Sequence, residues 1–330
     1  MKVLFIGGTG NISTRVSMLA LERGIDLYVL NRGTRDVILN GVKTIKADIS
    51  DPAEMSAAMQ NHIWDVVVNW IAFITADVKR DYEMFRGKTK QYIFISSASA
   101  YQKPLMNPII TESTPLENPF WQYSRDKIAC EALLNKYHNE NGFPFTVVRP
   151  SLTYDTVIPV PIGGWTEFTI VDRIIKGKKM IVHGDGSSLW TITHADDFAK
   201  GFIGLVGNQL AIGEAFHITS DEILTWDQIH TALAEAAEAE PHIVHIPSDL
   251  LAYYDPELFG SLTGDKSVSA VFDNSKIKKF VPGYQANIPF AQGIKRTLEW
   301  FKADKKRQII LQQTNDMMDS MINRFEKAYS

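Results

Sequence analysis

The sequence predicts a protein of the α/β class, built on a doubly wound parallel sheet of about seven strands with a smaller C-terminal α/β lobe. Strand and helix patterns alternate through the first half of the chain, which implies right-handed crossovers between parallel strands. Several strand segments are near-continuous runs of Val, Ile, Leu and Phe, as expected for strands buried on both faces. A glycine-rich turn joins the first strand to the first helix, as in sheets of this kind that bind nucleotides.

Six apolar segments in the first half are predicted strands. They are Lys2–Gly7, Asp26–Asn31, Val42–Ala47, Asp65–Ile71, Tyr92–Ser97 and Phe145–Arg149. Three helices are predicted between them, over Ser13–Arg23, from Ser50-Asp51-Pro52 onward, and within Asn118–Glu140. Gly24 suits the end of the first helix, and the Ser-Asp-Pro sequence suits the start of the second.

The rhythm loosens after Arg149-Pro150, where prolines and glycines mark a loop. Shorter elements are predicted at Glu167–Ile175, Met180–His183, Thr191–His194, Asp196–Val206 and Ala215–Thr219, and a long final helix at Asp304–Ala328. We therefore expect one domain over residues 1–150, completed by segments near 190–220. Residues 151–189 and 221–330 are expected to form a smaller lobe and C-terminal helices.

Composition excludes several classes of protein. In a chain of 330 residues, apolar residues make up 45% and charged residues 22%, which excludes a disordered, collagen-like or coiled-coil protein. The net charge of −4 provides no basic footprint, so neither nucleic acid nor a membrane surface is an expected partner. A single cysteine, Cys130, and no recognisable leader or membrane span predict a cytoplasmic protein, and the scattered histidines predict no metal site.

The glycine-rich turn predicts nucleotide binding. Gly7 and Gly10 allow the backbone to turn tightly and approach a pyrophosphate, whose charge then lies at the N-terminus of the following helix. Ser13 stands where a third glycine is usual, and it is small enough for the same helix–strand packing. The strand–turn–helix context therefore favours a Rossmann dinucleotide-binding domain over an ordinary turn.

The end of the second strand bears on the choice of dinucleotide. An acid at this place binds a free ribose 2′-hydroxyl, whereas an arginine accommodates a 2′-phosphate. Here the sequence is Asn31-Arg32-Gly33-Thr34-Arg35, which favours NADP over NAD, unless these arginines belong to an ordinary exposed loop. Asp48, at the end of the third strand, is placed either to accept a hydrogen bond from adenine or to cap the next helix.

Tyr123 and Lys127 lie four residues apart, so they share a face of the predicted helix. A nearby ammonium favours the phenolate and is expected to lower the tyrosine pKa into a range useful for proton transfer. Such a pair arises easily by chance. Its position gives it weight, because the preceding strand ends in Ser96-Ser97 at the edge where open α/β sheets bind ligands.

Together the glycine turn, the strand end Ser96–Tyr101, Tyr123-x-x-x-Lys127 and Arg149-Pro150 resemble the extended short-chain dehydrogenase/reductases, in particular the NAD-dependent epimerase/dehydratase family. The likeness continues through residues 194–197, 272–276 and 297–300, so it covers nearly the whole chain. It implies an enzyme that transfers hydride at a secondary alcohol, a lobe that closes over the substrate, and a homodimer.

The resemblance also implies roles for individual residues. Tyr123 would be the general acid/base, Lys127 would hold the nicotinamide ribose, and Ser97 would hydrogen-bond the reacting oxygen. The remaining implied contacts are with the cofactor: Gly7, Gly10, Asn11 and Ile12 at the pyrophosphate, and Asp48 and Ile49 at the adenine.

Two departures from the family bear on the substrate. Ala98 and Ser99 replace the acidic pair of the dehydratases, which disfavours dehydration. Trp190 stands where nucleotide-sugar enzymes commonly carry an arginine that binds the diphosphate, and residues 180–196 contain no lysine or arginine. We therefore expect an uncharged or singly charged sugar-like substrate, with Trp190, Trp165 and Tyr154 as candidate contacts.

Two alternatives stay open. The three aromatic residues could pack in the core, with Arg149 or Arg173 binding a phosphate, and the protein would then be a nucleotide-sugar epimerase. The other alternative is a non-catalytic relative that binds RNA or senses dinucleotides. It stays open because the Gly-Gly-Thr turn and Asn31-Arg32-Gly33 resemble chloroplast stem-loop binding proteins. The complete Ser97, Tyr123 and Lys127 set and the acidic net charge favour an enzyme.

Overall fold

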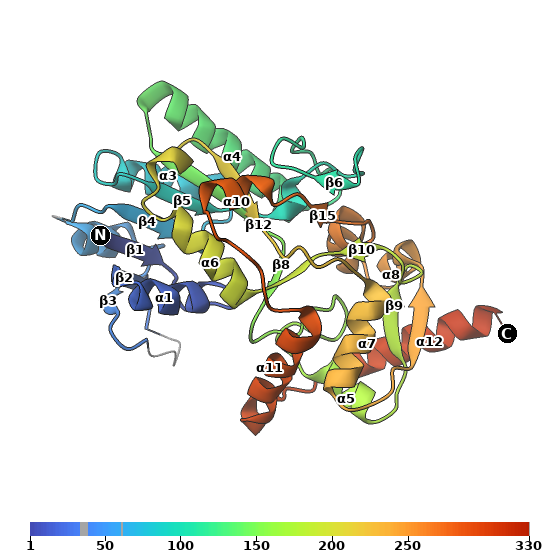
Figure 1. Cartoon of the computed structure of the whole chain (residues 1–330). Coiled ribbons are helices and arrows are strands. Elements are labelled where there is room, and N and C mark those ends of the chain that lie inside the picture. The colour runs from blue at the N-terminus through green and yellow to red at the C-terminus, as the bar shows by residue number, and fades with distance from the viewer. Residues whose placement is uncertain (34–38, 61, 330) are drawn as a thin grey trace.

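A computed structural model describes residues 1–33, 39–60 and 62–329, so Thr34 and Arg35 lie outside the described residues. Its largest sheet has seven parallel strands in the order β3-β2-β1-β4-β5-β7-β12 (Figure 1). The strands are β1 (Lys2–Ile6), β2 (Asp26–Asn31), β3 (Lys43–Lys46), β4 (Val66–Asn69), β5 (Tyr92–Ile95), β7 (Phe145–Pro150) and β12 (Ala215–Ile218). The predicted α/β fold and its parallel sheet are confirmed.

Helices cover both faces of this sheet because side chains alternate along each buried strand. Val3 and Phe5 of β1 pack against α1 (Ser13–Glu22) and α6 (Ala195–Leu205). Leu4 and Ile6 face the opposite layer. That layer contains α2 (Pro52–Met59), α3 (Thr75–Phe85) and α4 (Gln122–Asn141).

The strand order reverses at β1, whose neighbours are β2 on one side and β4 on the other. Crossover connections leave this point in opposite directions, so the carboxyl ends of the strands open into a crevice there. The turns that follow β1 to β5 therefore meet at one edge of the sheet.

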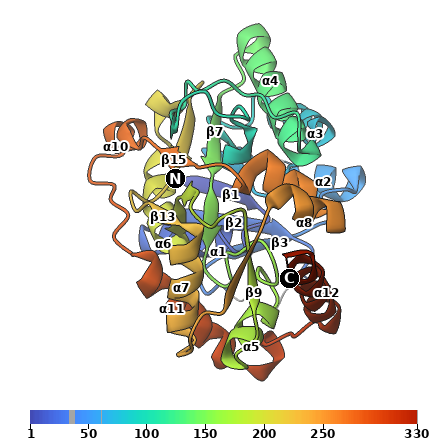
Figure 2. The ribbon, with the colours of Figure 1, turned by 90° about the vertical axis from the view of Figure 1, so that its right-hand side faces the viewer.

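The second half of the chain packs around a separate apolar core beside this edge (Figure 2). Its parallel pair is β9 (Met180–His183) with β14 (Ile243–Ile246). The helices around this core are α5 (Thr169–Ile175), α7 (Trp226–Ala236), α8 (Ser248–Tyr254), α9 (Leu258–Ser261), α11 (Phe290–Lys302) and α12 (Gln312–Tyr329). Helix α10 (Ser275–Phe280) instead returns to the large sheet, where Ile277 packs in the core beside α6 and β12. A π-helical turn, Leu262–Lys266, follows α9 directly.

Three further strand pairs connect the loops near the crevice. They are β6 (Ile109–Ile110) with β15 (Val271–Phe272), β8 (Leu152–Tyr154) with β11 (Ile192–His194), and β10 (Leu189–Trp190) with β13 (Leu224–Thr225). No helix within the described residues combines the length and the apolar character that a membrane span requires.

The final helix is shorter than the sequence pattern predicts, since α12 begins at Gln312 and not at Asp304. Asp304 instead caps a short 3₁₀ turn by accepting a hydrogen bond from the Lys306 N–H at 2.9 Å. The segment after this turn is held away from helical geometry, because the Ile309 carbonyl accepts a bond from the Phe168 N–H at 2.7 Å. Tertiary pairing thus overrides the local helical pattern.

Candidate active site

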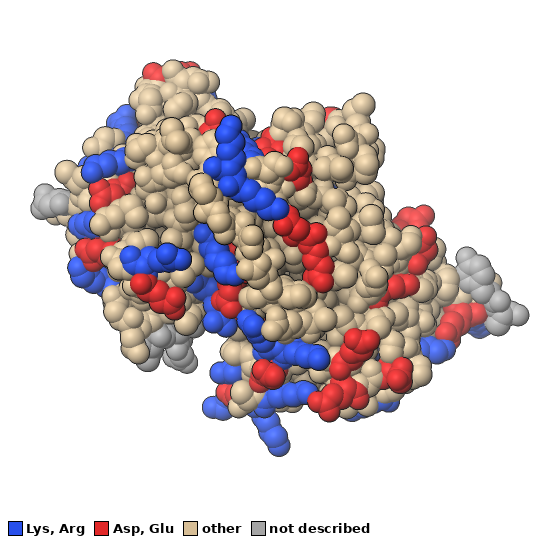
Figure 3. Space-filling view, viewed as in Figure 1, with Lys and Arg blue, Asp and Glu red and all other residues tan. Residues whose placement is uncertain are grey.

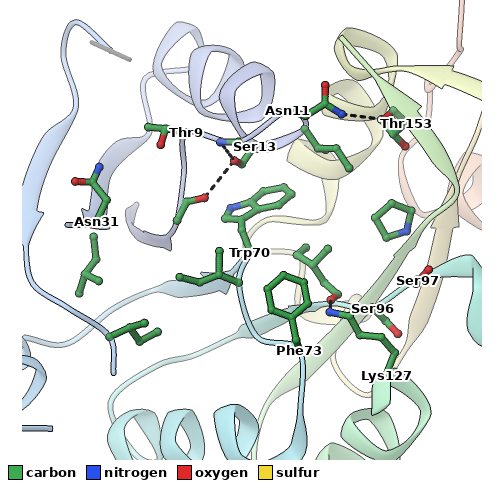
Figure 4. A pocket seen from close by; sticks show the side chains of 18 of the residues that line it. Thr9, Asn11, Ser13, Asn31, Trp70, Phe73, Ser96, Ser97, Lys127 and Thr153 are labelled. Atoms are coloured by element: carbon green, nitrogen blue, oxygen red, sulfur yellow. Dashed lines mark hydrogen bonds between the residues drawn. The ribbon is translucent and has the colours of Figure 1, made fainter. Parts of the chain in front are cut away.

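A cavity of about 640 Å³ lies at the carboxyl edge of the sheet, where the turns after β1 to β5 meet (Figure 4). Every residue predicted to bind a cofactor or to act in catalysis lines it: Gly7, Gly10, Asn11, Ile12, Asn31, Arg32, Asp48, Ile49, Ser97, Tyr123 and Lys127. Residues from four strand ends, those of β1, β2, β3 and β5, and from helix α4 are therefore brought together as the sequence analysis predicts.

The glycine turn has the backbone shape that a bound pyrophosphate requires. Gly7 has a φ of +81°, and a Cβ atom there would lie 2.8 Å from Cγ2 of Ile71. Ser13 stabilises the turn by accepting a hydrogen bond from the Gly10 N–H at 2.8 Å and donating one to the Gly7 carbonyl at 3.2 Å. Within the described residues no side chain caps the first turn of α1, and although the Thr14 N–H donates to the Gly10 carbonyl at 3.0 Å, the uncapped turn suits an anion.

Asn11 connects the glycine turn to the second half of the chain. Its amide donates to the Thr153 carbonyl at 2.9 Å, and its side-chain oxygen accepts from the Asp155 N–H at 3.0 Å (Figure 4). Arg15, one turn along α1, binds the Asp155 carboxylate through two hydrogen bonds of 2.8 and 3.0 Å. Both polar atoms of the Asn11 side chain are therefore bound to backbone atoms of residues 153 and 155. Asn11 contributes to the cavity by holding the glycine turn in place.

The end of the cavity beside β2 and β3 contains Asn31, Arg32 and Asp48, where the sequence predicts an adenine contact. The Asp48 carboxylate accepts bonds from the N–H and the hydroxyl of Ser50, which together with the Arg32 charge lower its pKa. Asp51, not Asp48, caps α2 by accepting from the Ala53 and Glu54 amides. Asp48 is thus left at the cavity wall, and the capping alternative for it is wrong.

Tyr123 and Lys127 lie on the first turns of α4, facing the strand end that carries Ser97. Ser97 hydrogen-bonds to the Ser99 hydroxyl at 2.9 Å and lines the cavity together with Tyr123. Ser99 in turn accepts a bond from the buried Ser124 hydroxyl at 2.8 Å. The residue that replaces a dehydratase acid therefore belongs to a hydroxyl chain that fixes Ser97.

Lys127 is almost fully buried, and its ammonium donates to the carbonyls of Ala72 at 2.7 Å and Ile95 at 2.8 Å. Burial lowers the pKa of Lys127 to about 8. Its Nζ lies 5.7 Å from the centre of the Tyr123 ring. The lysine is therefore held in the cavity wall by the backbone, beside the tyrosine.

The expected lowering of the Tyr123 pKa is wrong for the protein alone. Burial raises the pKa of Tyr123, and the Asp265 charge raises it further, while the hydrogen bond with Ser97 opposes both. The effect of the ammonium is absent because Lys127 is directed at two carbonyls and not at the phenol oxygen.

A second cavity of about 240 Å³ adjoins the first. The two share Ser97, Tyr123, Pro150, Ser151 and Trp165, so two of the three predicted catalytic residues lie at their junction. Trp165 is 47% exposed and lines both cavities, and its role as a substrate contact stays a prediction. Trp190 lines only the second cavity and is otherwise buried.

Three other predicted positions do not reach either cavity. Tyr154 is fully buried against His194 and Phe290, so its assignment as a substrate contact is not supported by its position. Arg149 binds both oxygens of Glu131, at 3.0 and 2.6 Å. Arg173 is buried and bound to Asp319 at 2.6 Å, so neither arginine is available for a phosphate here.

Sequence reasoning missed part of the site. Trp70 and Phe73 line the larger cavity after β4, and Trp121, Lys103 and Lys266 line the smaller one. Trp70 lies at the end of a predicted strand and Phe73 just after it, which is a usable signal, but the two lysines lie far apart in the sequence. No cluster suitable for a metal ion is present among the described residues.

Residues 3–218 match the model of the NAD dependent epimerase/dehydratase family, and the chain belongs to this family. Among curated proteins it is similar to the dTDP-glucose 4,6-dehydratase of Haemophilus influenzae, with 22% identity over 91% of this chain and 98% of the relative. It is also 25% identical to the chloroplast stem-loop binding protein of 41 kDa b of Arabidopsis thaliana, over 74% of this chain and 65% of that protein.

The fold is that of solved epimerases. The UDP-glucuronic acid 4-epimerase of Bacillus cereus in complex with NAD superposes with a TM-score of 0.73 at 17% identity, over 93% of this chain and 98% of that structure. Two features of the cavity fit a dinucleotide. A side chain at Gly7 would occupy the space through which a pyrophosphate approaches the backbone, and no side chain caps the start of α1 among the described residues.

Proposed function

We propose that the protein is an NAD(P)-dependent enzyme that transfers hydride at a secondary alcohol of a sugar, as an epimerase or a dehydrogenase. One observation carries this proposal: Ser97, Tyr123 and Lys127 converge at one cavity with the glycine turn. The proposal includes a division of the chain into two parts. Residues 1–150, with segments near 190–220, would form the dinucleotide-binding domain, and the rest would form a substrate lobe with C-terminal helices.

The residues near the junction of the two cavities would each have a separate role in the reaction. A bound nicotinamide would accept the hydride. Tyr123 would take the proton of the substrate hydroxyl at its phenol oxygen, and Ser97, fixed through Ser99, would orient the reacting oxygen. Lys127, in the wall beside Tyr123, would hold the nicotinamide ribose and supply a positive charge that favours the phenolate.

A nucleotide sugar is the substrate class that the relatives favour. The dTDP-glucose 4,6-dehydratase and the UDP-glucose 4-epimerases among them act, by their names, on such compounds. This supports the nucleotide-sugar alternative over our expectation of a substrate without a nucleotide. Ala98 and Ser99 in place of the acidic pair favour epimerisation over dehydration.

The test is Tyr123→Phe. We expect turnover to fall by about 10²- to 10⁴-fold because the proton acceptor is lost, while the dissociation constant of the dinucleotide stays unchanged. Tyr137→Phe is the matched control, because Tyr137 lies on the same helix and stacks on Tyr82, away from the cavity. Equal turnover in the two variants would remove Tyr123 from the proposed role.

RNA binding is the second candidate function, and the similarity to the chloroplast stem-loop binding protein favours it. On the face in Figure 3, Lys and Arg side chains are interspersed with Asp and Glu and form no continuous basic stripe. Micromolar or tighter binding of a stem-loop RNA that weakens steeply with salt would support this candidate.

A further inference from the structure

The smaller cavity holds a lysine whose charge lacks a partner. Lys103 is only 3% exposed, yet it lines the cavity together with Ser97 and Tyr123. Among the described residues, no hydrogen bond acceptor and no carboxylate within 4.0 Å satisfies its ammonium. A buried cation without a partner is costly, so its presence beside the catalytic residues calls for an anion that arrives from outside.

The backbone fixes the position of this lysine. The Lys103 N–H donates to the Glu117 carbonyl at 2.8 Å, and Tyr101, two residues earlier, forms a bridge with Leu116. Burial lowers the pKa of Lys103, whereas the charge of Asp265 raises it. An anion in the cavity would act in the same direction as Asp265 and favour the charged lysine.

Two further donors line the same cavity. The indole Nε1 of Trp190 is buried and has no hydrogen-bond partner among the residues that the structure describes. Lys266, at the end of the π-helical turn, shares its charge with Asp265 at 3.2 Å and lies over the Trp121 ring at 5.6 Å. Its backbone is held in place because its carbonyl accepts bonds from His183 and Trp226.

The charged side chains that line this cavity are two lysines and one aspartate, so the lining carries a net charge of +1 when all three are ionised. We infer that Lys103, with Lys266 and the Trp190 N–H, binds an anionic group, a carboxylate or a phosphate, carried by the sugar that reacts at Tyr123. This inference rests on the proposed function and names the substrate class of that site. It places the anion on the reacting sugar, because the cavity is lined by Ser97 and Tyr123 themselves.

The experiment measures binding to the NAD-loaded protein by calorimetry. The probes are UDP-glucose and UDP-glucuronate, which differ in a sugar carboxylate, UDP alone, and glucose 6-phosphate against glucose. We expect the wild-type protein to bind UDP-glucuronate or glucose 6-phosphate at least about 10-fold more tightly than its neutral counterpart, as for one charge-assisted hydrogen bond. The pair that shows the larger difference identifies the carboxylate or the phosphate as the source.

Lys103→Met should abolish this preference and leave UDP and UDP-glucose within about 2-fold of wild type. Trp190→Phe should reduce it by a smaller factor, because only one neutral donor is removed. Lys88→Met, at an exposed position outside both cavities, is the control. The ligand-free melting temperature of Lys103→Met should equal or exceed that of wild type, since a structural lysine would instead lower it.

An equal loss for UDP, UDP-glucose and UDP-glucuronate in Lys103→Met would overturn the inference, because the lysine would then bind the nucleotide diphosphate. The absence of any preference in the wild-type protein would overturn it as well, even if the variant does not fold. These readouts are binding constants and remain measurable if Tyr123→Phe retains turnover, so failure of the proposed function and of this inference are distinguishable.

Discussion

The two adjoining cavities are built in different ways. The larger one is formed mainly by turns that directly follow neighbouring strands of one sheet, the glycine turn among them. The smaller one is formed by side chains of the loop after β5, the start of α4, β10, the π-helical turn and β15. The first arrangement suits a cofactor shared by many enzymes, and the second suits selection of one substrate.

After the loss of Tyr123, the largest expected effect on turnover comes from Ser97, at the junction between the cavities. Ser97→Ala should lower turnover by about 100-fold, because one preorganised donor to the reacting oxygen is lost, with the dinucleotide dissociation constant unchanged. Ser97→Thr retains the hydroxyl and should restore most of the activity in the same assay. If both variants lose turnover equally, Ser97 acts through packing and the junction has no chemical role.

Lys127 provides a test of burial in the larger cavity. Its pKa is lowered to about 8 from an ordinary 10.5, so between these pH values the unfolded chain binds a proton that the folded protein has released. The unfavourable effect of the buried charge is therefore full below pH 8 and disappears as pH rises through this window. Relative to Lys127→Met, the unfolding free energy of wild type should rise by about 3 kcal/mol across it.

Chemical denaturation of both proteins over this pH range measures the difference, and titrations common to the two cancel. Lys88→Met, in which an exposed lysine is replaced, should show no such slope. A flat difference for Lys127→Met would mean that its ammonium stays charged through its two carbonyl partners.

The close approach of the backbone at the glycine turn of the larger cavity is tested at Gly7. Gly7→Ala should weaken dinucleotide binding by about 10- to 30-fold, because a positive φ costs an alanine about 1–2 kcal/mol and its Cβ would displace Ile71. Gly24→Ala carries the same positive φ with no atom within 4 Å, so it should lower stability alone. A dinucleotide affinity that survives Gly7→Ala contradicts the close approach at this turn.

The smallest expected effect concerns the choice of cofactor. Arg32→Ala should weaken NADP binding by about 10-fold and leave NAD within about 2-fold, because only the 2′-phosphate needs the exposed guanidinium. Fluorescence titration with both dinucleotides measures this. An equal loss for the two would refute the preference for NADP that the sequence predicts.

The same contrast explains what could be predicted from sequence. The seven-stranded sheet and the larger cavity follow from short-range patterns: buried strands, the turn from Gly7 to Ser13, and the spacing of Tyr123 and Lys127. The second cavity could not be predicted, because Lys103 and Lys266 lie 163 positions apart and meet only through the packing of the π-helical turn. Local periodicity carries no information about such contacts.

Tyr154 and the final helix illustrate the same limit. The sequence places Tyr154 close after the β7 strand end, which made it a candidate contact, yet its ring is enclosed by His194 and Phe290 from distant segments. The pattern around Asp304 is helical, but the pairing of Ile309 with Phe168 prevents that helix from starting there.

The bonds of Asn11 and Arg15 to residues 153–155 bear on the entropy of cofactor binding. These four hydrogen bonds join the start of α1 to the segment around β8, so this part of the wall of the larger cavity is ordered when the chain folds. A dinucleotide then loses its own freedom on binding but need not immobilise this wall, and its affinity is higher for that reason. The glycine turn and the segment around β8 consequently behave as one preorganised unit.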